Sequence, residues 1–338
     1  MKRLVLVLSL MTLVAIPAFA TFSIVAFDPV TGDVGVAVAS RVLAVGAEVP
    51  WVEAGVGAVA TQASNNVAYG KRGLELLRQG LTAQQVLDRL LAEDNGRNKE
   101  GRQVAVIDKN GNVAVHTGTS ASDWRGHKTG KYFSVQGNVL AGPEVVEAMA
   151  RTFENTQGEL AEKMYAAMKA GDDAGGDRRG RQSASIIVYR KDGGRLVNDD
   201  IYADVRVDDH PQPFGELRRL LNLALFRSNG PTRDRLITEG KIREARVIVS
   251  RMLQYRPDAV NAQVMSGVLM HLDGDTDAAV RTLQRARTTD QAAFEAEWNR
   301  ILSAPAFAQY KSRLEAPAFV NRVIPPPRDD IGSVSFER

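Results

Sequence analysis

Thr21 is the residue of this sequence best suited to act as a catalytic nucleophile, provided that it becomes the first residue of the mature chain. A hydroxyl is a weak nucleophile until a nearby base removes its proton, and the α-amine of a terminal residue can be that base. The pKa of an α-amine is about 7.7–8.0, close to the pH at which a general base works best. Because nucleophile and base would then belong to one residue, Thr21 would need no His or Asp partner. The alternative interpretation is that Thr21 only begins a β-strand, where Thr is common.

The segment before Thr21 has the three parts of a secretory signal peptide. It starts with Met-Lys-Arg, continues with an uncharged apolar run over residues 4–16, and ends with Pro17-Ala18-Phe19-Ala20. The apolar run is too short to be a comfortable membrane anchor. We therefore expect residues 1–20 to be removed and the protein to be exported, in a bacterium to the periplasm or the medium. An uncleaved anchor is the alternative.

A loop rich in glycine and arginine, Gly175–Ser183, could hold the substrate beside Thr21. Glycines let the backbone approach a ligand closely, and an Arg guanidinium recognises a carboxylate through a planar pair of hydrogen bonds. The residues expected to hold an acyl or carboxylate group of the substrate are Asp177, Arg179, Arg181 and Gln182. A solvated turn with internal Asp–Arg pairing is the alternative. No nucleotide-binding loop of the form Gly-x-x-x-x-Gly-Lys-Ser/Thr is present.

Other polar residues could assist the site or serve the fold alone. Asn65 and Asn66 follow a predicted strand and precede a predicted helix, so they can cap that helix or supply an oxyanion-hole amide. In Asp208-Asp209-His210, the alternation along a strand sends the two carboxylates to opposite sides. We therefore expect no metal site there, but a supporting polar cluster made of Arg41, Asp208, Asp209 and His210.

The composition is that of a soluble globular protein and excludes several kinds of site. Of the 338 residues, 44% are hydrophobic and 25% are charged, and the net charge is +3. The absence of Cys excludes disulfides, thiolate nucleophiles and iron–sulfur clusters, and there are only four His residues for a metal centre. Basic charge is not concentrated as it is in nucleic-acid-binding proteins. We expect no cofactor, no nucleic-acid partner and no stable membrane insertion after signal cleavage.

The elements that must position these residues alternate between strands and helix pairs. Periodicity and turn residues predict strands over residues 21–27, 34–40, 55–62, 103–108, 112–117, 183–189 and 201–207. They predict helices over residues 66–79, 82–94, 143–155 and 158–170, with a capping box from Thr82 to Gln85. This order favours an α+β fold in which two sheets pack face to face between outer helix layers, a four-layer αββα sandwich. A single-sheet α+β domain is the alternative.

The strand pattern stops at Phe214, and a helical repeat follows. Gly240–Ala245 aligns with Gly274–Ala279 at an offset of 34 residues, and Gly267 lies seven residues before Gly274. This pattern resembles the tetratricopeptide repeat, in which small residues let paired helices pack closely. We expect an αββα domain over residues 21–225, a tetratricopeptide-like helical region over 226–310 that contacts a protein partner, and an extended tail over 311–338.

Five separated blocks of the sequence resemble the family called domain of unknown function 1028. The blocks are TFSIVAFDPVTGDVGVAVASR at 21–41, VGAVATQ at 56–62, QGN at 136–138, GGDRRGRQSA at 175–184 and VRVDDHP at 205–211. The resemblance implies a fold similar to that of the N-terminal-nucleophile hydrolases, in which a Thr, Ser or Cys begins the mature chain at the start of a strand. Thr21 matches that position.

Together these patterns predict an exported amidohydrolase-like protein in which Thr21 attacks an amide of a small or peptide-like substrate through an acyl-enzyme. A non-catalytic protein of the cell envelope that binds a ligand on the same fold is one alternative. An interaction scaffold whose helical tail recruits a protein is another. The resemblance by itself does not establish an activity.

Overall fold

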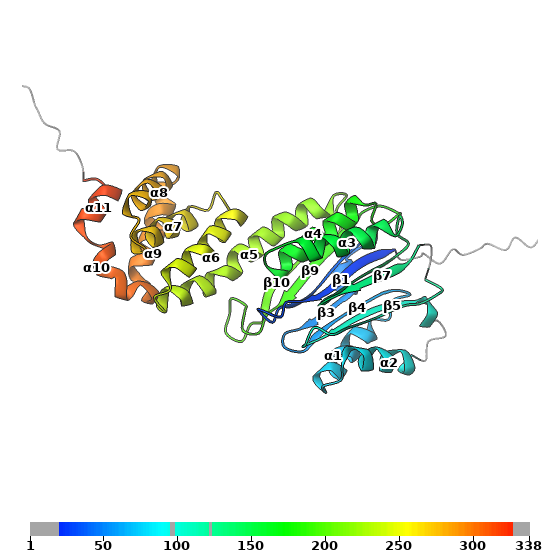
Figure 1. Cartoon of the computed structure of the whole chain (residues 1–338). Helices are drawn as coiled ribbons and strands as arrows, with labels where there is room; N and C mark the ends of the chain where they lie inside the picture. Colours follow the sequence, from blue (N-terminus) through cyan, green and yellow to red (C-terminus); the bar gives the residue numbers. More distant parts are fainter. Residues whose placement is uncertain (1–19, 95–98, 122–123, 327–338) are drawn as a thin grey trace, which may run out of the picture. The chain divides into compact units, whose positions relative to one another are not determined.

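The computed structural model describes residues 20–94, 99–121 and 124–326 (Figure 1). The predicted signal peptide lies outside the described residues except for Ala20. The chain divides into two compact units. The first unit runs through Ile187 and includes Arg206–Phe214, and the second comprises Val188–Val205 and the chain from Gly215 onward. None of the helices in the described ranges is both long and apolar enough to cross a membrane.

Two antiparallel sheets form the body of the protein, and the α+β expectation is confirmed at this level. The six-stranded sheet has the order β10 (Ile201–Val207), β9 (Ser183–Tyr189), β2 (Val34–Ser40), β1 (Thr21–Phe27), β8 (Phe133–Asn138) and β7 (Gly126–Gly130). The four-stranded sheet has the order β3 (Pro50–Glu53), β4 (Gly57–Ala63), β5 (Arg102–Asp108) and β6 (Val113–Thr117).

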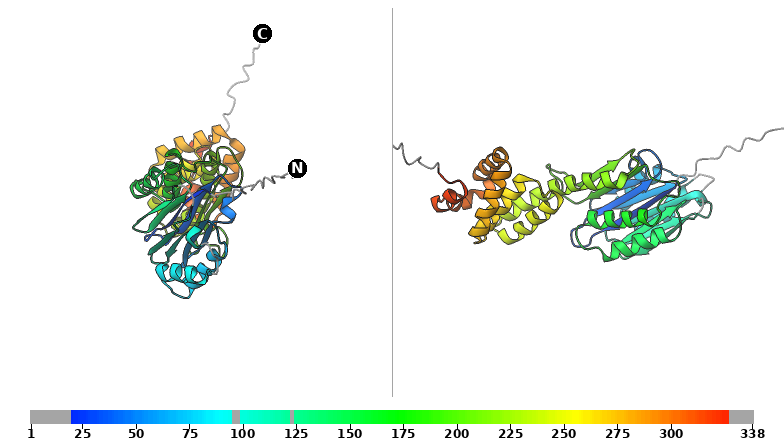
Figure 2. Two further views of the ribbon diagram at one scale, coloured as in Figure 1. Left: turned by 90° about the vertical axis from the view of Figure 1, so that its right-hand side faces the viewer. Right: turned by 90° about the horizontal axis from the view of Figure 1, so that it is seen from above.

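Apolar side chains fill the space between the sheets and beneath the helices that cover them. Val25, Val36 and Val38 of the six-stranded sheet pack against Ala60 and Ile107 of the four-stranded sheet. Two helices, α1 (Ala68–Arg78) and α2 (Ala83–Glu93), pack on the four-stranded sheet, and α3 (Glu144–Asn155) and α4 (Leu160–Asp173) pack on the six-stranded sheet (Figures 1 and 2). The predicted capping box is confirmed, because Thr82 and Gln85 exchange hydrogen bonds at the start of α2.

The sequence does not predict β3, β7 or β8. β3 has only four residues, and β7 has the sequence GHKTG, whose composition is poor in strand-forming residues. In β8, alternate positions are polar but nevertheless buried, namely Ser134, Gln136 and Asn138. These three side chains face the interior that also contains the side chain of Thr21.

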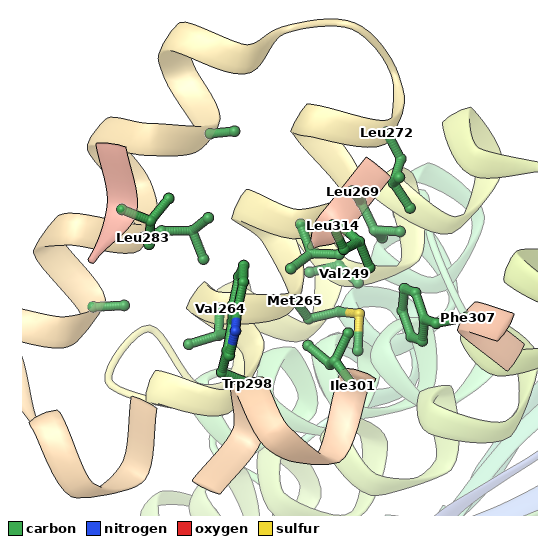
Figure 3. Close-up of a cluster of buried hydrophobic side chains, with 14 of the residues drawn as sticks. Val249, Val264, Met265, Leu269, Leu272, Leu283, Trp298, Ile301, Phe307 and Leu314 are labelled. Carbon is green, nitrogen blue, oxygen red and sulfur yellow. The ribbon is translucent and has the colours of Figure 1, made fainter. Parts of the chain in front are cut away.

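The carboxyl-terminal region is helical, as the sequence predicts. It contains α5 (Pro213–Thr238), α6 (Ile242–Tyr255), α7 (Val260–Leu272), α8 (Thr276–Thr289) and α9 (Gln291–Ser303). The small residues of the repeat pattern are at close contacts: Ala245 and Ala279 are fully buried, and a Cβ on Gly267 would lie 2.6 Å from Leu283 Cγ. Figure 3 shows the apolar cluster around Val264, Leu283 and Trp298.

Two expectations about this region differ from the structure. The predicted domain boundary at residue 225 falls inside α5, which continues through Pro231 to Thr238. The predicted extended tail contains two short helices, α10 (Lys311–Leu314) and α11 (Pro317–Val323). The tail folds back because Leu314, Phe319 and Val323 are buried in the apolar cluster of the helical region. Residues 327–338 of that tail lie outside the described part of the chain.

Candidate functional site

Thr21 begins β1, which lies in the six-stranded sheet between β2 and β8. In the two registers its strand partners are Ser40 and Asn138, both polar and both buried. Thr21 itself is 2% exposed in the chain that still carries Ala20. The end of this central strand therefore brings three polar side chains together at one edge of the sandwich.

The Thr21 hydroxyl and the carbonyl group that precedes it are held by the same neighbours. Thr21 Oγ1 donates a hydrogen bond to Ser40 Oγ at 3.1 Å, and Ser40 Oγ in turn donates to the carbonyl oxygen of Ala20. Arg179 Nη2 donates to that same oxygen at 2.9 Å. Two donors, one of them cationic, thus converge on the carbonyl oxygen next to the candidate nucleophile.

Arg179 is held in place by a buried carboxylate. Asp177 Oδ1 accepts hydrogen bonds from Arg179 N at 2.8 Å and Arg179 Nε at 3.2 Å, and Asp177 Oδ2 accepts from Arg179 Nη2 at 3.0 Å. Asp177 Oδ2 also accepts from Arg41 N at 2.7 Å, while Arg41 Nη1 donates to Arg179 O. Gly176 and Gly180 adopt positive φ angles of 48° and 114°, so glycine is required for this loop to bend. Asp177, Arg179 and Arg41 therefore form one assembly beside Thr21.

A buried amide network holds the other side of Thr21. Gln62 Nε2 and Asn138 Nδ2 donate to the Thr21 carbonyl oxygen at 3.3 and 3.5 Å. The same two nitrogens donate to Gln103 Oε1 at 2.8 and 3.0 Å. Ser23 Oγ donates to Gln62 Oε1 at 2.7 Å and accepts from Gln136 Nε2 at 2.6 Å. Hydrogen-bonded groups in a low-dielectric interior have little freedom, so the position of Thr21 is tightly specified.

The backbone is unusual directly after two of these amides. Ala63 follows Gln62 with a φ of 66°, and Val139 follows Asn138 with a φ of 52°. A positive φ is a true outlier for a β-branched residue such as Val, and such strain gathers at functional sites. The strain lies at the strand ends that carry the two donors to Thr21.

A pocket of about 330 Å³ opens at the same edge. Its lining includes Ser40, the bonding partner of Thr21, together with Phe22, Asp172, Arg181 and Phe214. The rings of Phe22 and Phe214 are stacked with centroids 6.4 Å apart. Arg181 Nε donates to Asp172 Oδ1 at 2.5 Å, and this hydrogen bond raises the pKa of the Arg181 guanidinium further.

Asn65, Asn66 and Gln182, which the sequence also proposes as site residues, make hydrogen bonds to groups other than Thr21. Asn66 Oδ1 accepts a hydrogen bond at 3.2 Å from the backbone N–H of Ala68, the first residue of α1, and Asn65 Oδ1 accepts from Thr61 Oγ1 at 3.1 Å. Asp209 Oδ1 accepts from Gln182 Nε2 at 3.2 Å.

The predicted polar cluster of Arg41, Asp208, Asp209 and His210 is divided between two places. Arg41 joins the Asp177 assembly. Asp208 pairs with Arg206 at 3.2 Å, and His210 Nδ1 accepts from Gln212 N at 2.9 Å. In the described ranges, no three acidic or His side chains converge into a metal-binding group.

Sequence reasoning misses Ser40, Gln62, Gln103 and Asn138. Ser40, Gln62 and Gln103 are polar residues in strands that are mostly apolar, as in VGVAVAS and GAVATQA, whereas Asn138 ends the strand FSVQGN, in which alternate residues are polar. Buried polar side chains need hydrogen-bond partners, so polar residues in positions that face the sandwich interior are the signal that could have identified them. Which strands face each other is a tertiary fact that the sequence pattern does not contain.

The comparisons with known proteins concern the first part of the chain. A family model described as "Family of unknown function (DUF1028)" matches residues 21–217. The chain is 32% identical to a protein from Silicibacter pomeroyi with the same family designation, whose crystal structure is similar with a TM-score of 0.55. That match covers 61% of this chain and 86% of the other. No curated protein shows a significant match.

Proposed function

The chain belongs to the DUF1028 family, whose function is unknown, and from the site described above we propose that it is an amide hydrolase whose nucleophile is Thr21. The observation that carries this proposal is that the carbonyl oxygen of Ala20 accepts two hydrogen bonds, one from Arg179 and one from Ser40. That carbonyl group is bonded to the Thr21 nitrogen. A substrate carbonyl in the same place would therefore lie beside both the hydroxyl and the free α-amine of Thr21.

The chemistry follows from these positions. Thr21 Oγ1 forms a bond to the amide carbon while its proton passes to the α-amine, which acts as the general base. The negative charge that develops on the amide oxygen is stabilised by Arg179 Nη2 and the Ser40 hydroxyl, which are already held in position. When the intermediate collapses, the leaving amine takes the proton from the α-ammonium group. Water then hydrolyses the ester on Thr21, with the α-amine again as the base.

The layering of the first unit supports this proposal. Two facing antiparallel sheets, each covered by a helix pair, are similar to the arrangement in N-terminal-nucleophile hydrolases, and Thr21 begins a central strand. Gln62 and Asn138 bind the Thr21 carbonyl oxygen, so they would keep the residue in place once it has become a chain terminus.

The test is intact-mass analysis after incubation with a β-lactone, an electrophile that acylates an activated hydroxyl. We expect one lactone to add to the protein and digestion to locate it on Thr21. Thr21→Ser should still react and Thr21→Ala should not, whereas Thr31→Ala, at an exposed turn, should react like the unchanged protein. An adduct elsewhere, or none, would contradict the proposal. Stabilisation by a ligand without any adduct would instead favour the binding-protein alternative.

We also propose that cleavage after Ala20 accompanies export to the periplasm or the medium and creates the free α-amine of Thr21. Amino-terminal sequencing of the exported protein tests this, and a mature chain that starts elsewhere would contradict it.

The helical region, which we propose to be tetratricopeptide-like, would bind a protein partner. Retention of all partners after α6–α9 are removed would exclude that role.

A further inference from the structure

The pocket beside Ser40 contains one cation whose hydrogen-bonding capacity is largely unused. An Arg guanidinium has five N–H donors. Within the described part of the chain, Arg181 uses only its Nε donor, toward Asp172 Oδ1 at 2.5 Å. Its two Nη groups make no hydrogen bond to the described residues, its side chain is 42% exposed, and Arg181 is one of the residues that line the pocket. The two Nη groups of one guanidinium lie in one plane and can donate a parallel pair of hydrogen bonds to a carboxylate.

Arg179, the other Arg predicted to recognise an anion, does not have the same unused donors at the pocket. Its guanidinium binds Asp177 and the Ala20 carbonyl oxygen, and it does not line the pocket. The roles of the two residues therefore differ. Arg179 is placed for the reacting carbonyl, and Arg181 for a group further along the ligand.

The rest of the lining restricts the ligand in two ways. Phe22, Phe214, Pro211 and Pro213 give the pocket an apolar wall. Asp172, Asp173 and Asp177 also line it, each with a cationic partner: Arg181, Lys169 and Arg179 respectively. With these carboxylates nearby, a dianion such as phosphate would be repelled more strongly than a singly charged carboxylate.

We propose that this pocket binds the carboxylate end of a peptide-like acid, with Arg181 as the residue that recognises the carboxylate and the Phe22–Phe214 wall contacting an apolar side chain. Asp172 is a positioning residue that orients the Arg181 guanidinium. This inference rests on the proposed function, because it names the substrate class of the same site: an amide, one half of which carries a carboxylate and an apolar group. Ser40 joins the pocket to the nucleophile, since it lines the pocket and accepts the Thr21 hydrogen bond.

The test measures binding in the absence of turnover, in the full chain carrying Thr21→Ala. Ligand-observed NMR titrations would compare N-acetyl-L-leucine, its neutral amide and inorganic phosphate. We expect the acid to bind at least tenfold more tightly than the neutral amide or phosphate. Arg181→Lys should weaken binding of the acid about 10- to 100-fold, because Lys lacks the planar pair of donors. Asp172→Asn should weaken it less, since the guanidinium remains but is no longer fixed.

Arg178→Lys is the matched control, because Arg178 lies on the same loop but is not among the residues that line the pocket. The Arg178→Lys protein should therefore bind the acid with unchanged affinity. Equal binding of acid and amide, binding of phosphate as tight as that of the acid, no binding of the acid, or unchanged affinity in Arg181→Lys would each overturn the proposal. The outcomes separate the two proposals. A lactone adduct on Thr21 without carboxylate binding would support Thr21 as the nucleophile and contradict the carboxylate subsite. Carboxylate binding without an adduct would support the subsite and contradict Thr21 as the nucleophile.

Discussion

The two units of this protein bury polar groups very differently. In the first unit, amide and hydroxyl side chains fill the end of the sandwich near Thr21, among them Gln62, Gln103, Gln136 and Asn138. In the second unit the buried cluster around Val264 is entirely apolar. Of the described residues in that unit, only Ser228, Asn229 and Glu297 are buried polar ones.

The first unit therefore has an interior that contains hydrogen-bonded polar side chains, whereas the buried cluster of the second unit consists of packed apolar side chains. Burying a polar group is unfavourable unless every hydrogen bond is remade, so a polar interior contributes less to stability than an apolar one of the same size. The side chains of the amide network around Thr21 are hydrogen-bonded to one another, and this network fixes the position of Thr21. The helical unit needs only shape complementarity between small and large apolar residues, as between Gly267 and Leu283.

The largest expected effect comes from one extra residue in front of Thr21. In a mature chain that begins at Ala20, the Thr21 nitrogen is part of a peptide bond and is not basic. The carbonyl oxygen of Ala20 also accepts the hydrogen bonds of Arg179 and Ser40 that the substrate would need. We expect the rate of lactone addition to fall by about 10³-fold or more, the combined loss of a general base and of the two oxyanion donors. The measurement is the rate of mass increase, and thermal unfolding of the helical unit should not change.

The second effect removes apolar packing from the helical unit. Leu283→Ala deletes a fully buried side chain, so the free energy of unfolding of that unit should fall by about 2–5 kcal/mol. Denaturant titration measures it. Lactone addition at Thr21, measured where the variant remains folded, should be unaffected. A parallel loss of Thr21 reactivity would show that the helical core also supports the site.

The third effect removes the centre of the amide network. Gln103 accepts from Gln62 and Asn138 and donates to Gly137 O at 2.9 Å. Gln103→Leu should lower the free energy of unfolding by about 1–3 kcal/mol, because it leaves buried partners without a hydrogen bond. It should also slow lactone addition per folded molecule, since the hold on Thr21 is loosened. Gln84→Leu, on the exposed side of α2, is the control. Unchanged reactivity in folded Gln103→Leu would mean that the network serves stability alone.

The smallest effect is a pH dependence in the helical unit. His271 stacks on Phe319 with ring centroids 3.7 Å apart, and burial lowers the pKa of its imidazole below the ordinary 6.5. The unfolded chain therefore binds a proton at a higher pH than the folded chain, so stability falls as the pH drops below about 6.5. We expect the melting temperature of this unit to decrease between pH 7.5 and 5, and the decrease to be smaller in His271→Gln. Burial also lowers the pKa of His127 in the first unit, so only the variant assigns the effect to the helices.

Local signals in the sequence were sufficient for most elements. β1 and β2 have the predicted bounds because turn residues at Asp28–Asp33 separate two runs of β-branched residues. α2 begins where Thr82 and Gln85 form a capping box. Local signals failed for β8, whose alternate residues are polar yet buried, and for α5, which continues through a Pro that normally ends a helix.

The candidate site shows where sequence reasoning stops. Thr21, Asp177 and Arg179 were identifiable from the sequence, and the structure brings them together. Asn65 and Asn66 were equally plausible amides, but they remain with their own strand and helix. Gln62 and Asn138 hold Thr21 instead.

What the sequence by itself determined is the local structure and the residue types: where strands and helices begin, that Thr21 starts a strand, and that an Arg-rich loop follows α4. Those properties depend on neighbours within a few residues. Only the tertiary structure decided which side chains meet. Thr21 is joined to Gln62 and Asn138, and Ala20 to Arg179, by strand pairing and sheet packing between segments separated by 41 to 159 residues. No local pattern encodes these contacts, because they depend on which faces of two sheets are buried against each other.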